Sequence, residues 1–228
     1  MSDDQCIAAA LLPGSESQPP PPPRAAAAKP LKRPTQARAV FTVQAIYDAF
    51  VRIWRQHGWA GVTTRAVALE TGVSVGTLYD YFPNKAALLS GYVRHCMEQL
   101  LQAIEQQAIA PPDLAWQARV QTLIRLTCGV HTPDLPWFNA DMLALEAGIA
   151  EAKHHRRVHE ELLTAWIRVF EACDDLPTRP SHEAIQAMHL AVWGGRRYGL
   201  LLGLSDVEAA QWAAQMERLC LVMVTSSE

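Results

Sequence analysis

The segment from Thr63 to Phe82 constrains the fold of this 228-residue chain more than any other. It predicts two short helices, the first beginning at Thr63 and ending at Gly72, the second beginning at Ser74. Threonine and serine are favoured N-caps because their side-chain oxygens accept a hydrogen bond from a free backbone N–H group. Gly72 can adopt the left-handed conformation that a tight turn needs. Two short helices joined in this way form a helix-turn-helix.

The apolar positions of this segment divide its second helix into a buried and an outward face. We expect Ala68 where the two helices meet, and Leu78 and Phe82 in their shared core. The outward face then carries Val75, Gly76, Thr77, Tyr79 and Tyr81. An α-helix fits a DNA major groove, where a threonine can bond to a base edge and a glycine permits close approach.

Helix N-termini flank this face on both sides. Thr63 and Thr64 begin one helix and Lys85 begins the next, and a helix N-terminus attracts phosphate through free N–H groups and its dipole. Arg65 adds a positive charge on the first turn. The predicted DNA-contacting residues are therefore Thr63, Thr64, Arg65, Val75, Gly76, Thr77, Tyr79, Tyr81 and Lys85.

The rest of the chain also predicts helices. Apolar residues recur at helical spacing, and prolines or glycines separate the segments. Helices are expected over residues 36–57, 85–107, 113–130, 139–150, 151–173, 181–202 and 205–225. No stretch alternates with the two-residue period of a strand. The predicted fold class is all-α, with an N-terminal three-helix helix-turn-helix domain over residues 35–84 and a C-terminal helical bundle over residues 85–228.

Residues 1–34 predict a disordered tail, because a run of prolines from Pro19 to Pro23 replaces the large hydrophobic residues of a core. The first 100 residues carry a net charge of +3 and the remainder −6, so a nucleic-acid contact is expected in the N-terminal part. Basic residues lead into the first helix: Lys29, Lys32, Arg33 and Arg38. These residues are consistent either with an N-terminal arm that contacts DNA or with a tail that only increases solubility.

The five cysteines form no CxxC pair, which indicates reduced thiols in a cytoplasmic protein. Asp3 and Asp4 stand where a signal peptide would be basic, and the apolar stretch from Ile7 to Leu12 is too short for export or for a membrane span. We expect a cytoplasmic protein with no membrane partner.

The segment around the helix-turn-helix resembles the DNA-binding domain of TetR-family transcriptional regulators (TetR/AcrR type). The resemblance covers about residues 36–97 and depends on the Thr63-Thr64 start, Gly72-Val73-Ser74 and the run from Thr77 to Lys85, "TLYDYFPNK". Two positions depart from the family. Val75 stands where many members have Lys or Arg, and Asp80 where a basic or polar residue is common. Fewer phosphate contacts, or greater use of the N-terminal arm, are therefore expected.

The resemblance implies a homodimer that binds a palindromic operator in double-stranded DNA, with an unknown small-molecule effector held in the C-terminal bundle. It also implies dimerisation through the last two long helices. The predicted function is a ligand-responsive transcriptional repressor. The alternative is a helical protein-interaction or ligand-carrying module with weak or lost DNA binding. The sequence shows no nucleophile motif, metal cluster or phosphate loop, so neither an enzyme nor a cofactor is expected.

Aromatic and methionine side chains in the C-terminal half are candidates for an effector pocket, because they suit a flat or apolar ligand. For each of them, ordinary core packing is the competing interpretation. The predicted ligand-binding residues are Trp116, Trp137, Phe138, Met142, Trp166 and Trp193.

Two further patterns occur in the C-terminal half. His155 and His159 could share a metal ion with Glu151, but no second cluster completes a site, so a solvated basic helix face is favoured and no metal is expected. Gly194 and Gly195 interrupt a helix and predict close helix approach near the two-fold axis of a dimer. The expected self-complementary surface comprises Leu200, Leu201, Leu204, Trp212, Leu219 and Met223.

Overall fold

The computed structural model describes Pro30 and residues 37–225. The tail predicted over residues 1–34 therefore lies outside the described residues, apart from Pro30. The described residues form nine α-helices and one π-helical turn, with no β-strand among them, which confirms the all-α fold. No helix in this part of the chain is long and apolar enough to cross a membrane.

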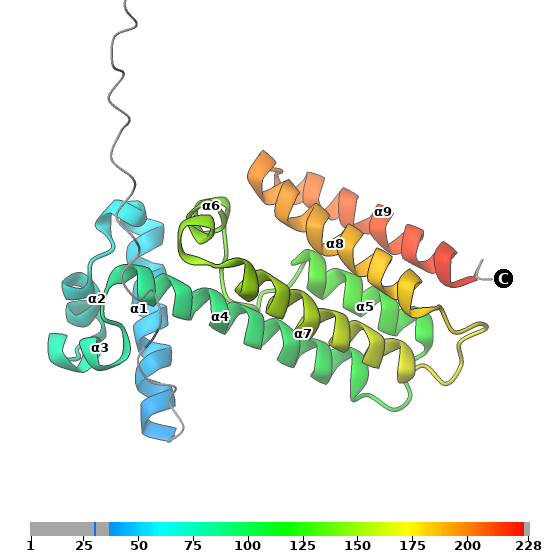
Figure 1. The fold of residues 1–228 in the computed structure, drawn as a ribbon, viewed down its shortest axis with the longest axis horizontal. Helices are drawn as coiled ribbons and strands as arrows, with labels where there is room; N and C mark the ends of the chain where they lie inside the picture. The colour runs from blue at the N-terminus through cyan, green and yellow to red at the C-terminus, as the bar shows by residue number, and fades with distance from the viewer. Residues whose placement is uncertain (1–29, 31–36, 226–228) are drawn as a thin grey trace, which may run out of the picture.

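Three helices form a small unit at one end of the molecule: α1 (Ala37–Gly61), α2 (Thr64–Thr71) and α3 (Val75–Tyr81) (Figure 1). The predicted turn residues act as expected. Thr63 accepts a hydrogen bond from the Ala66 amide, and Gly72 ends α2 in the left-handed conformation with φ 77°. The helix-turn-helix predicted from the sequence is confirmed.

A long helix, α4 (Lys85–Ile104), leaves this unit and enters the bundle, where it continues as the π-helical turn η1 (Glu105–Ile109) (Figure 1). Its first half buries Leu88 and Tyr92 in the core of the N-terminal unit. Its second half buries Leu100 in the core of the bundle. One rigid helix thus belongs to both cores.

The bundle contains α5 (Trp116–Cys128), α7 (Ala152–Glu171), α8 (His182–Leu202) and α9 (Asp206–Thr225) (Figure 1). A short helix, α6 (Ala140–Ile149), lies between the bundle and the N-terminal unit. Every predicted helical segment overlaps one of the helices of the structure, and most boundaries agree within a few residues.

The close helix approach predicted at the glycines of α8 occurs within one chain. A Cβ atom on Gly195 would lie 2.3 Å from Cζ2 of Trp212 on α9, so only glycine fits there. Gly195 and Trp212, which were both expected near a two-fold axis, thus pack against each other within one chain. Gly194 lies on the exposed face of α8, where a Cβ atom would have no neighbour within 4 Å.

A buried arginine fixes the junction between η1 and α5. The Arg119 side chain is 3% exposed, although arginine is seldom buried. Its guanidinium donates hydrogen bonds only to backbone carbonyls at the end of η1 and in the connection to α5. These carbonyls have no N–H partner within a helix. The acceptors are Ala108, Ile109, Pro111, Pro112 and Leu114.

Replacing this arginine should therefore destabilise the fold. We expect Arg119→Met to lower the free energy of unfolding by about 3 kcal/mol, because several buried carbonyls lose a charged donor. Urea unfolding followed by circular dichroism measures the change. Arg156→Met, at an exposed position on α7, is the control; an equal loss in both variants contradicts the role given to Arg119.

Candidate nucleic-acid interface

The outward face of α3 is the surface that the sequence predicted for DNA. Val75 and Tyr79 are 38% and 45% exposed, whereas Leu78 on the opposite face is fully buried. Gly76 is exposed as well, and Thr77 and Tyr81 are half-buried. Phe82 is buried in the N-terminal core, as predicted.

Ser74 organises the N-terminal end of α3. Its Oγ accepts a hydrogen bond of 3.0 Å from the Thr77 amide and lies 2.8 Å from the Thr77 hydroxyl. The Thr77 hydroxyl is therefore held at the end of the helix that would enter a groove first.

The beginning of α2 lies beside the same face. The Thr64 hydroxyl is 3.2 Å from the Tyr79 hydroxyl, so a hydrogen bond joins the first turn of α2 to α3. Thr63 and Arg65 are exposed next to it. These residues, predicted separately, come together around one helix N-terminus.

The beginning of α4 forms the other flank. Asn84 caps this helix by accepting a hydrogen bond of 2.8 Å from the Ala87 amide. The ammonium group of Lys85 lies 4.4 Å from the centre of the Trp59 ring, a cation–π contact that holds the charge in place. The sequence reasoning missed Trp59, although it directly follows Gly58, whose positive φ of 64° redirects the end of α1.

Acidic residues reduce the positive charge of this surface unequally. Glu70 forms an ion pair of 2.8 Å with Arg52 that ties α2 to α1. Asp80 is exposed on α3 itself. Besides the paired Glu70, the face therefore carries the Asp80 carboxylate and the cations of Arg65 and Lys85, which fits the expectation of few phosphate contacts.

A cavity of about 260 Å³ lies in the bundle between α4, α6, α7 and α8. Two of the six predicted ligand-binding residues, Phe138 and Trp193, line it. Trp116 and Trp166 are buried elsewhere in the bundle core. The other two predicted residues pack against the core of the N-terminal unit: Trp137 and Met142.

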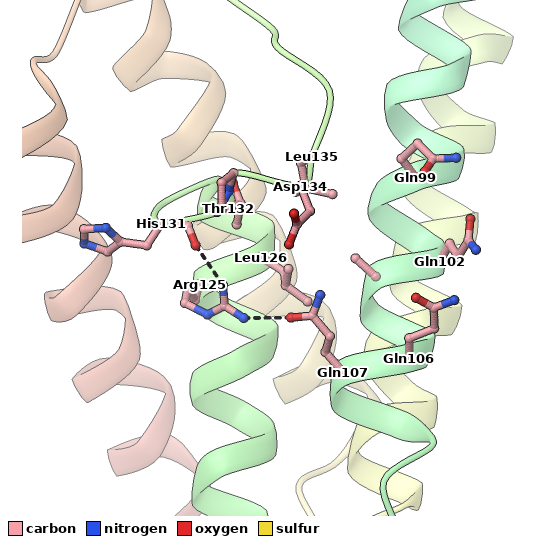
Figure 2. A pocket seen from close by; sticks show the side chains of 12 residues that line it. Gln99, Gln102, Gln106, Gln107, Arg125, Leu126, His131, Thr132, Asp134 and Leu135 are labelled. Carbon is pink, nitrogen blue, oxygen red and sulfur yellow. Dashed lines mark hydrogen bonds between the residues drawn. The ribbon is translucent and has the colours of Figure 1, made fainter. Parts of the chain in front are cut away.

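A second hollow, of about 360 Å³, is polar (Figure 2). Glutamines of α4 and η1 line one side, and the loop after α5 lines the other. Arg125 donates hydrogen bonds to Oε1 of Gln107 at 2.9 Å and to the His131 carbonyl at 3.0 Å. None of the six predicted ligand-binding residues lines this hollow.

The histidines tested for metal binding face different partners. Nδ1 of His155 lies 3.7 Å from Oε1 of Glu146, and the His159 ring centre lies 5.0 Å from that of His189. Within residues 37–225 no three His, Cys, Asp or Glu side chains form a group that could hold a metal ion.

This geometry defines an all-α protein with a helix-turn-helix at one end and a cavity-bearing helical bundle behind it. The family model described as "Bacterial regulatory proteins, tetR family" matches residues 46–91. The N-terminal part of the chain therefore contains a DNA-binding domain of the tetR type.

Two curated relatives are similar to part of this chain. The transcriptional repressor DrrR1 of Streptomyces coeruleorubidus is 27% identical over 110 residues, which are 46% of this chain and 37% of that protein. The transcriptional repressor KstR of Mycolicibacterium smegmatis is 38% identical over 65 residues, 28% of this chain and 32% of that protein. The chain thus matches about a third of the length of these relatives.

A solved structure extends the similarity of the fold to the bundle. A TetR transcription regulator from Haloarcula marismortui superposes with a TM-score of 0.57 at 19% sequence identity, covering 79% of this chain and 98% of that one. The likeness therefore includes the arrangement of both parts.

Gly76 offers a direct test of the DNA-facing surface. A Cβ atom there would meet only the Ser74 hydroxyl, at 3.7 Å, so no packing within the chain requires glycine. We expect Gly76→Ala to raise the free energy of unfolding by about 0.5–1 kcal/mol, because alanine is the better helix former. The same variant should bind duplex DNA about tenfold more weakly, since about 1.4 kcal/mol of steric cost in the groove has that effect.

Thermal unfolding and a duplex titration measure the two effects of Gly76→Ala separately. Ala144→Gly, the reverse exchange at an exposed position of α6, controls for helix propensity away from the α3 face. Unchanged DNA affinity in a stabilised Gly76→Ala protein contradicts the assignment of this face to DNA.

Proposed function

We propose that this protein is a ligand-responsive transcriptional repressor that binds a palindromic operator as a homodimer. The observation that carries the proposal is the exposed face of α3, flanked by the N-termini of α2 and α4 and backed by fully buried Leu78. Such a face suits base contacts in a major groove, with phosphate contacts on either side.

Exposed apolar side chains on α8 and α9 support a dimer. Large exposed apolar patches usually mark an interaction surface. Leu201 and Leu219, both predicted for this surface, are 57% and 45% exposed. Tyr198 and Val222 add to it, while Gly194 leaves room for a second helix to approach. A two-fold axis would place the same patch of each copy in contact.

The connection from α5 to α6 supports a response to a ligand. Phe138 lines the bundle cavity, and the backbone carbonyl of its neighbour Trp137 accepts a hydrogen bond of 2.6 Å from the Tyr92 hydroxyl of α4. Met142 of α6 is fully buried in the N-terminal core. A ligand that displaces α6 would therefore move residues packed against the helix-turn-helix, provided that it binds one arrangement better than the other.

DNA binding is tested by selecting random duplexes on the purified protein and titrating the enriched site. We expect a palindrome whose affinity falls about tenfold or more in Thr77→Ala, because one lost base contact costs about 1–3 kcal/mol. Lys85→Met should reduce the slope of log affinity against log salt by about one per protomer, since one phosphate contact is lost. No enrichment at low salt contradicts DNA binding and leaves the interaction module as the function.

The dimer is tested with Leu201→Glu combined with Leu219→Glu. Charges buried in the interface should yield a monomer by light scattering, and operator affinity should fall about 100-fold because the two half-sites are no longer linked. Leu69→Glu, at an exposed leucine of α2, should leave the protein dimeric. A double variant that stays dimeric excludes this surface as the interface.

A further inference from the structure

The bundle cavity has an apolar wall and one charged end. Apolar side chains from α4, α7, α8 and the connection to α6 form the wall, among them Val93, Met97, Leu100, Phe138, Val158 and Trp193. A volume of about 260 Å³ equals the space of roughly nine liquid water molecules at about 30 Å³ each, enough for on the order of ten non-hydrogen atoms.

The carboxylate at the charged end is already paired. Glu146 of α6 is 6% exposed and accepts a hydrogen bond of 2.9 Å from Nη2 of Arg197 on α8. Its other oxygen lies 3.7 Å from Nδ1 of His155 on α7. A cationic ligand would have to displace Arg197 to reach this carboxylate.

Arg196 also lines the cavity, and it has no such partner. Its Nη1 donates a hydrogen bond of 3.1 Å to the Thr127 carbonyl, and its guanidinium lies 5.5 Å from the centre of the Trp193 ring. Within residues 37–225 no carboxylate lies at ion-pair distance from it. Burial lowers the pKa of Arg196, the direction expected for a cation that has lost water without gaining an anion.

The sequence leaves room for this guanidinium. A Cβ atom on Gly129, which ends α5, would lie 2.7 Å from Nη2 of Arg196. The remaining titratable side chains at the cavity are Cys96, whose pKa burial raises to about 12, and His159, which packs on the ring of His189. Neither supplies a negative charge near neutral pH. The charged end thus holds two guanidiniums for one carboxylate.

We propose that this cavity binds a small amphipathic carboxylate, its apolar body against the wall and its carboxylate on Arg196. Arginine and a carboxylate form strong, charge-assisted hydrogen bonds. A neutral ligand of the same shape would leave Arg196 without an anionic partner. This inference rests on the proposed function, in which the bundle is the effector-binding half.

The test compares three probes of one shape on the full chain: octanoate, octan-1-ol and octylamine, titrated by calorimetry. Octanoate should bind at least about tenfold more tightly than octan-1-ol, because a charge-assisted hydrogen bond adds to the same apolar contact. Arg196→Met should remove this preference. Octanoate that binds no better than the alcohol or the amine, or fails to bind the folded protein at millimolar concentration, overturns the proposal.

A second variant keeps the test decisive if Arg196→Met fails to fold. Glu146→Gln removes the competing carboxylate and frees Arg197, so octanoate should bind several-fold more tightly while octan-1-ol is unaffected. A purely structural role of Glu146 predicts no such gain. Glu160→Gln, at an exposed position of α7, should change neither affinity. Unchanged octanoate affinity in Glu146→Gln contradicts the proposed charge balance.

The same titration on the chain bound to its selected duplex separates the two proposals. If octanoate binds but the duplex is retained, the repressor response fails and the carboxylate site stands. If the duplex binds and octanoate does not, the carboxylate site fails and the DNA-binding function stands.

Discussion

The structure depends on the burial of one helix in two cores. The first half of α4 places Leu88 and Tyr92 among the side chains of the helix-turn-helix, and its second half places Leu100 and Ile104 in the bundle. Because packed cores resist deformation, the continuous backbone of α4 fixes the position of the N-terminal unit relative to the bundle. Any change in the bundle that tilts α4 must also move α3, which lies at the end of the molecule opposite the C-terminus (Figure 1).

The helix α6 makes a second connection between the same two parts, and it is built differently. Met142 anchors it in the N-terminal core, while Glu146, one turn further, reaches an arginine of the bundle. The apolar contact of Met142 depends on close packing and is lost within about 1 Å of separation. The Glu146 carboxylate, in contrast, can exchange its arginine for another charged partner. The connection through α4 is therefore rigid, whereas the connection through α6 can change when the ion pair of Glu146 is exchanged.

Much of the fold could be predicted from local patterns, because caps and breakers act within a few residues. Thr63, Gly72 and Ser74 mark the helix ends where the structure has them, and Phe82 is buried as its spacing indicated. The effector residues could not be assigned in this way. Helical spacing shows that Trp137 and Met142 are apolar positions but not which core receives them, and they pack with the N-terminal unit. Arg119, Glu146 and Arg196 gave no signal, since the partners of a buried charge are set by tertiary contacts.

The energies involved are compatible with control through α6. Coupling between two sites of a regulator is typically about 1–3 kcal/mol. A close, largely buried charge pair has a coupling energy of similar or larger size, about 1.5 kcal/mol upward. Rearranging the single Glu146–Arg197 contact would therefore involve a free energy of the size that such coupling needs. The second arginine determines the sign of the favoured ligand. Because Arg196 has no carboxylate partner, a negatively charged ligand would be stabilised in the cavity more than a positively charged one.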